Sequence, residues 1–120
     1  MAGYRIDRIS EDIKREIIAV IRELKDPRVM DKMITVVRVE VSSDASFAKA
    51  YISALEGIET AASAVKGLES ATGYIRREIG KRLHLRKTPE LKFIADNSIE
   101  HGMKIVKIMD ELKVDDKNDD

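Results

Sequence analysis

The stretch GYIRREIGKRLHLRKTPELK, residues 73–92, concentrates positive charge. From residue 76 onward it carries seven lysines and arginines against two glutamates, a local net charge of +5. The whole chain is neutral, with 22 basic and 22 acidic side chains. Salt screens exposed charges over about 10 Å, so a local cluster matters more to a polyanionic partner than the total charge. The stretch predicts electrostatic contact with phosphates.

Helical spacing orders this charge into one face. Arg77, Lys81 and His84 follow one another at steps of four and three, flanked by Arg76 and Arg82. Two interpretations compete, a phosphate-binding surface and an ordinary solvated helix face. On the second interpretation Arg82 pairs with the glutamate one turn earlier.

The sequence offers no constellation for catalysis. His84 lies among cations and His101 is expected on a helix surface, so neither predicts a metal site. The run Ser42-Ser43-Asp44 is typical of a turn, and no glycine-rich phosphate loop is present. We expect no catalytic residue, no metal and no cofactor.

Aromatic side chains are sparse. We judge them too few and too scattered for a platform on which single-stranded bases stack, so contacts to the nucleic-acid backbone should dominate. The five are Tyr4, Phe47, Tyr51, Tyr74 and Phe93.

Hydrophobic periodicity predicts the elements that hold the basic face. A helix runs from about Ile6 to Lys25 and ends before Pro27. Alternation predicts strands at 36–41 and 47–55, joined as an antiparallel hairpin. In the first strand Val37, Val39 and Val41 share one face. In the second, three alanines indicate that a helix lies close against the sheet.

The second half of the chain predicts two short helices, at 60–70 and 74–83, then a strand at 91–96 and a last helix that Asn97 caps. Ile75, Ile79 and Leu83 form the buried line of the basic helix. The apolar face of the last helix is expected to cover the core. The order is α-β-β-α-α-β-α, an α+β fold with a layer of helices on a three-stranded sheet.

Composition bounds the class of protein. A chain of 120 residues with 43% hydrophobic residues suits one domain, and the lack of cysteine suits a reducing compartment. The charged N-terminus and the lack of a long apolar run predict a cytoplasmic protein without a membrane segment. Residues 110–120 carry a net charge of −4, and we expect residues 114–120 to be a disordered acidic tail.

Five motifs fall in the order of one known family. The chain resembles the ribosome-binding factor A family from about Arg5 to Leu112. The motifs are ELKDPR (23–28), VEVSSD (39–44), SATGYIRREIGKRL (70–83), RKTPEL (86–91) and DNSIEHGM (96–103).

The resemblance implies a single type II KH-like domain over residues 1–113. In ordinary KH domains a GxxG loop grips the nucleic-acid backbone, whereas this family has a kink of the form Ala-x-Gly, here Ala71-Thr72-Gly73. We expect Gly73 to let the chain change direction without a Cβ penalty and Ala71 to let the two helices approach closely.

The resemblance further implies a non-catalytic factor that binds the free small (30S) ribosomal subunit and assists late maturation and 5′-end processing of 16S rRNA, with a link to growth in the cold. The implied partners are the subunit and its rRNA, and a GTPase release factor is a further candidate. We expect a monomer. Arg5 and Arg8 are weaker RNA-contact candidates, and the main ones are Arg76, Arg77, Lys81, Arg82, Arg86 and Lys87.

Two other classes of function stay open. One is a protein-interaction module that uses the sheet face or the last helix. The other is a small α+β hydrolase, for which no catalytic set is found. Exchanging Arg77 and Lys81 for glutamate separates these classes, because only RNA docking should collapse.

Overall fold

The computed structural model describes residues 2–99, 101–102 and 105–110, with side chains from Ile6 onward. Its elements follow the predicted order. Each boundary lies within about two residues of the prediction, except that the first helix begins four residues earlier than expected. They are α1 (Ala2–Glu23), β1 (Ile34–Val41), β2 (Phe47–Ala54), α2 (Ile58–Ser70), α3 (Thr72–Leu83) and β3 (Glu90–Ala95).

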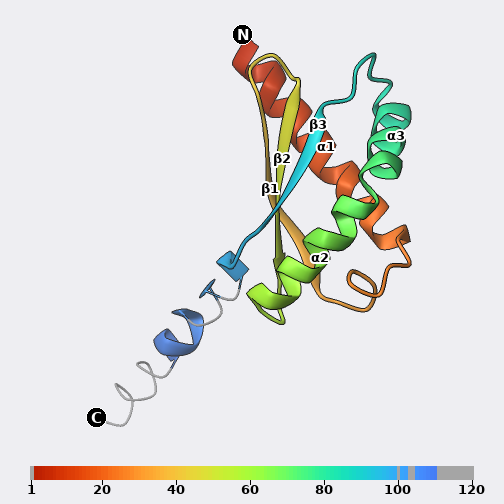
Figure 1. The fold of residues 1–120 in the computed structure, drawn as a ribbon. Helices are drawn as coiled ribbons and strands as arrows, with labels where there is room; N and C mark the ends of the chain where they lie inside the picture. Colours follow the sequence, from red (N-terminus) through yellow and green to blue (C-terminus); the bar gives the residue numbers. More distant parts are fainter. Residues whose placement is uncertain (1, 100, 103–104, 111–120) are drawn as a thin grey trace.

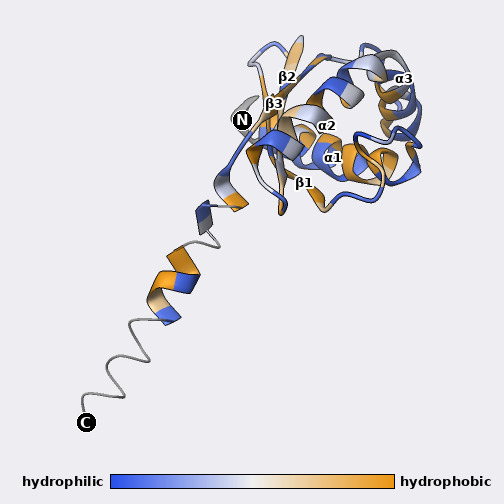
Figure 2. Ribbon diagram, turned by 60° about the horizontal axis from the view of Figure 1, so that its bottom comes forward, coloured by the Kyte–Doolittle hydropathy of each residue, from blue (hydrophilic) through white to orange (hydrophobic). Residues whose placement is uncertain are grey.

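The three strands form one sheet in the order β1-β2-β3. β1 and β2 pair as the expected antiparallel hairpin, whereas β3 runs parallel to β2. A parallel neighbour requires a crossover, and α2 and α3 supply it. The helices α1, α2 and α3 gather on one side of the sheet (Figures 1 and 2). The other face is open along most of its length, but Ser53 near the end of β2 is buried, and its hydroxyl accepts from the N–H of Ile99 (3.4 Å).

Small side chains on β2 let the helices pack closely on the sheet. Ala48, Ala50 and Ala54 are at most 1% exposed, as predicted for a strand under a helix. α1 packs on β1, and α2 packs on β2 and β3. The largest fully buried apolar side chains are Ile13, Ile17, Val20, Ile52, Leu68, Ile75 and Ile79.

The face assignment of β1 was wrong at its beginning. Val36 pairs with Ile52 and Arg38 pairs with Tyr51, so Val37 is an extra residue at a β-bulge. The bulge shifts the alternation by one residue. Val36 therefore joins Val39 in the core, at 3% and 8% exposure, in place of Val37.

The last helix does not cover the core with its described residues. Residues 98–99, 101–102 and 105–110 are helical, and residues 105–110 point away from the sheet (Figure 1). Ile99, at the start of the helix, is half-buried. Four apolar side chains further along are 46–56% exposed, so the expected cap on the core is wrong for them; they are Ile105, Val106, Ile108 and Met109. The acidic tail, Glu100 and the side chain of Arg5 lie outside the described residues. Within the described helices, none is long and apolar enough to span a membrane.

Candidate nucleic-acid interface

Two buried isoleucines fix the orientation of α3. Ile75 and Ile79 are fully buried, and Leu83 packs against the same core. Arg77 and Lys81 lie on the other side of the helix and are exposed. Because residues four apart lie about 5–6 Å from each other on a helix surface, these two cations form one local patch.

The turn after α3 adds two further cations. His84 ends the helix in the left-handed conformation (φ 53°), and its backbone N–H donates to the carbonyl oxygen of Gly80. Arg86 and Lys87 follow and are exposed, and the chain then enters β3. The turn therefore begins directly where the patch on α3 ends.

Arg76 holds this turn against α3. Its Nη2 donates to the carbonyl oxygen of Thr88 (2.8 Å) and its Nε to that of Pro89 (3.1 Å). The side chain is partly buried, and Pro89 is buried. Arg76 therefore positions the cations of the turn while its Nε and Nη2 donate within the protein.

Arg82 is also held by the protein. Its guanidinium lies 2.9 Å from Glu23, 3.5 Å from Glu16 and 3.6 Å from Glu78. The hydrogen bond to Glu23 raises the pKa of Arg82, and the other two carboxylates act in the same direction. The expected pair with Glu78 is present. The two partners on α1 were missed, although Glu16 and Glu23, seven residues apart, had to share one face of that helix.

The six predicted cations thus divide into two that brace the fold and four that face solvent. Among the described residues, none of the four takes part in a salt bridge. We call these four, Arg77, Lys81, Arg86 and Lys87, the basic surface. Arg8 lies apart from it on α1, in a shallow hollow with Asp7, Glu11 and Asp12.

The kink between α2 and α3 turns at Ala71, not at Gly73. Ala71 has φ −99° and ψ 9°, and its N–H donates to the carbonyl oxygens of Gly67 and Leu68. Gly73 is an exposed helical residue without a positive φ, and a Cβ placed there would meet nothing within 4 Å. The expectation that the chain changes direction at Gly73, and needs glycine there to avoid a Cβ clash, is therefore wrong.

The loop after α1 anchors the end of α2 beside the kink. Arg28 donates to the carboxylate of Asp26 from Nη2 (2.7 Å) and Nε (3.0 Å), and to the hydroxyl of Ser70 (3.4 Å). The side-chain and backbone hydrogen bonds from Arg28 lower the pKa of Asp26 to about 2. At Gly67 a Cβ would lie 3.0 Å from Val29, so α2 and this loop are in close contact.

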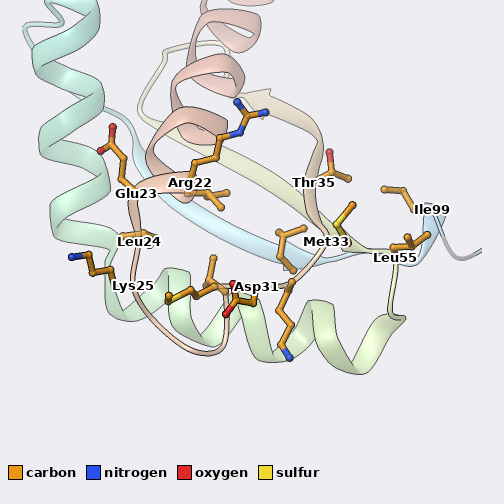
Figure 3. A pocket seen from close by; sticks show the side chains of 14 residues that line it. Arg22, Glu23, Leu24, Lys25, Asp31, Met33, Thr35, Leu55 and Ile99 are labelled. Carbon is orange, nitrogen blue, oxygen red and sulfur yellow. The ribbon is translucent and has the colours of Figure 1, made fainter.

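A separate apolar hollow of about 730 Å³ lies below the end of α1 (Figure 3). Leu24, Met33, Leu55 and Ile99 contribute apolar lining. Met33 is 65% exposed, so the hollow is open to solvent. No catalytic set converges there, and the described residues hold no group of three potential metal ligands.

Comparison with known proteins gives a consistent match. The family model for ribosome-binding factor A matches residues 5–109. A ribosome-binding factor A from Acetivibrio thermocellus is 50% identical over 114 residues, covering 94% of this chain and 92% of that protein.

Two structures of relatives agree with this match. A ribosome binding factor A of Thermotoga maritima, solved by NMR, is 34% identical with a TM-score of 0.71, covering 82% of this chain and 92% of that one. A homology model of the Thermus thermophilus ribosome binding factor A, fitted into the cryo-EM map of a 30S complex, is 29% identical with a TM-score of 0.58, covering 69% of this chain and 86% of that one. The chain belongs to the ribosome-binding factor A family.

Proposed function

We propose that this protein binds the free small (30S) ribosomal subunit through its basic surface and assists the late maturation of 16S rRNA. The observation that carries the proposal is the group of four exposed cations that α3 and the following turn hold together. The Thermus thermophilus relative in a 30S complex supports it. The protein acts without catalysis, by docking on folded RNA and stabilising one arrangement of it.

The basic surface suits contact with phosphates rather than base reading. Arg77 and Lys81 are point contacts on a rigid helix, and Arg86 and Lys87 extend them along the turn. Phosphate contacts orient a protein on RNA without reading its sequence. Four such contacts should give log K against log salt a slope of roughly −3 to −4.

The proposal is tested by co-sedimentation with isolated small subunits and, separately, with whole ribosomes over a series of salt concentrations. Arg77→Glu combined with Lys81→Glu should weaken binding by roughly tenfold or more and flatten the slope. Lys66→Glu is the matched control, because Lys66 is exposed on α2, away from the basic surface. Equal loss in the control, or binding that is indifferent to salt, would refute the assignment.

Processing of the 5′ end of 16S rRNA is the finer part of the proposal. In cells that lack the gene, the wild-type chain should restore mature 5′ ends and growth in the cold, and the Arg77→Glu/Lys81→Glu variant should not. We place the protein in the cytoplasm, as a monomer whose release a GTPase promotes. Light scattering tests whether the protein is a monomer. Loss of co-sedimentation on adding the GTPase with GTP tests whether the GTPase promotes release.

A second candidate function is contact with another protein through the last helix. Ile105, Val106, Ile108 and Met109 favour it, because each exposes about half of an apolar side chain. Ile105→Asp with Ile108→Asp should then weaken binding to complete small subunits but leave binding to protein-free 16S rRNA unchanged. An equal effect on both would exclude a protein contact at this helix.

A further inference from the structure

The open face of the sheet carries an ordered set of side chains that neither the core nor the basic surface uses. On β2 the alanines and Ile52 point into the core, so Phe47, Lys49 and Tyr51 point the other way. In the sheet register Lys49 lies between Glu40 on β1 and Lys92 on β3, and Tyr51 lies beside Arg38 on β1. Aromatic and basic side chains therefore alternate along the central strand.

Among the described residues, Phe47 does not belong to the hydrophobic core cluster. It is 57% exposed at the start of β2, where a polar residue would serve the strand as well. A hollow of about 220 Å³ lies beside it, and its other lining residues are Glu40, Val41, Ser42 and Lys49. The ring thus borders a recess that is open to solvent.

A second flat group lies two pleats further along the same strand. The guanidinium carbon of Arg38 is 4.0 Å from the centroid of the Tyr51 ring. Glu40 fixes both partners, because it accepts from Arg38 Nε (3.0 Å) and from the Tyr51 hydroxyl (3.1 Å). Arg38 is therefore held in place over the ring, with 53% of its side chain exposed.

Lys49 lies between these two groups on β2. Both Lys49 and Lys92 are exposed, and within the described part of the chain neither forms a salt bridge. Four residues of a strand span about 13 Å, so two cations lie midway between two surfaces on which bases could stack. Aromatic rings and arginine planes are the surfaces on which proteins stack unpaired bases, and lysines beside them contact the intervening phosphates.

The sequence had suggested that the aromatic residues are too scattered for base stacking, but the structure brings Phe47 and Tyr51 to one face of β2. We propose that the open sheet face binds single-stranded RNA. One base stacks on Phe47, a second stacks on the Arg38–Tyr51 pair, and Lys49 and Lys92 contact the phosphates between them. Binding is tolerant of sequence, because every base offers a flat face. This site is separate from the basic surface, and it does not depend on docking to the small subunit.

The first test uses the wild-type chain. An unstructured RNA of about ten nucleotides, within the range that a single domain holds, is titrated while the backbone amide signals are followed by NMR. Signals of residues 47–51 and 92–94 should shift, and a duplex of the same sequence should shift them far less. Shifts confined to residues 76–87, equal shifts with the duplex, or no shifts at all would overturn the proposal.

Variants then test the stacking itself. Phe47→Ala and Phe47→Leu should both weaken binding by roughly 5-fold to 100-fold, because leucine keeps the apolar bulk but lacks the ring. Lys49→Glu should also weaken it, whereas Lys66→Glu on α2 should not. Full affinity in Phe47→Leu would overturn stacking, since a merely apolar contact tolerates leucine.

The outcome is distinguishable from that of the proposed function. Arg77→Glu with Lys81→Glu should leave the single-strand shifts at residues 47–51 in place while small-subunit binding falls. If Phe47→Leu instead lowers binding to complete small subunits but the RNA strand never shifts the sheet signals, the face binds a protein and the inference is wrong.

Discussion

Two glycines in the same helix should respond oppositely to alanine. At Gly80, a Cβ would lie 2.6 Å from Thr88 Oγ1, well inside van der Waals contact. At Gly73, a Cβ would meet nothing within 4 Å. Both residues belong to α3, so the intrinsic preference of a helix for alanine acts on both.

The expected magnitudes follow from two opposing terms. Alanine is favoured over glycine in a helix by about 0.8–1.0 kcal/mol, and an overpacked site loses about 1–3 kcal/mol. Gly73→Ala should therefore raise the free energy of unfolding by about 0.5–1 kcal/mol. Gly80→Ala should lower it by about 1 kcal/mol, because the overpacking exceeds the gain in propensity.

The backbone of Thr88 has little freedom to move away from a new methyl group. Arg76 donates to the carbonyl oxygens of Thr88 and Pro89, and the Pro89 side chain is fully buried. Removing the hydroxyl should restore the space, because the nearest remaining atom, Thr88 Cβ, is 3.9 Å from the new methyl. In a Thr88→Ala background Gly80→Ala should become stabilising, with a coupling energy of about 1–3 kcal/mol between the two sites.

Urea unfolding followed by circular dichroism measures all five chains: wild type, the three single variants and the double variant. Two results would contradict this prediction. One is a Gly80→Ala variant as stable as Gly73→Ala, and the other is a Gly80→Ala substitution that still lowers the free energy of unfolding in the Thr88→Ala background. A further result concerns Gly73 alone. If Gly73→Ala is more stable but binds small subunits less tightly, the bare backbone at position 73 serves the partner rather than the fold.

Three further predictions concern the core, the stability at low pH and the basic surface. Ile75→Ala should lower the free energy of unfolding by about 2–5 kcal/mol in urea, whereas Val106→Ala, at a site 52% exposed, should change it by less than about 0.5 kcal/mol. The pKa of Asp26 falls from 3.8 to about 2 on pairing with Arg28, so its stabilising contribution is complete above pH 3.8 and is lost as the pH falls through 2. Asp26→Asn should therefore flatten an acid titration of stability between these values while leaving the limb above pH 5 unchanged. Lys81→Ala should reduce the salt slope of small-subunit binding by about one unit, and an unchanged slope would remove Lys81 from the phosphate contacts.

The order of elements was predictable because periodicity is a local property of the chain. The stripe of α1 and the alternation in β2 and β3 each lie within one segment, and the structure confirms them. The bulge in β1 was not predictable in this way. Val36 and Val37 are both apolar and β-branched, so the pattern cannot tell which of them faces the core.

The residues of the site were less predictable, because the type of a basic residue does not reveal whether it bonds to a residue that is distant in the sequence. Arg76 and Arg77 are identical in type and adjacent, yet Arg76 is bound to carbonyl oxygens twelve and thirteen residues later, and Arg77 is exposed. Likewise, Arg82 takes a carboxylate 59 residues away. Only the packing of α3 against α1 and against the turn before β3 separates these arginines.

The two braced arginines matter for the four that are exposed. Arg82 fixes α3 to α1 through Glu16 and Glu23, and Arg76 fixes the turn to α3. A phosphate surface built on such supports loses little conformational freedom on binding beyond that of its own side chains. Substituting Arg76 or Arg82 should therefore weaken RNA docking even if neither touches RNA. The slope of log K against log salt tells whether the substituted residue contacts RNA or only supports the fold. Loss of a contact lowers the slope, whereas loss of a support lowers the affinity with the slope intact.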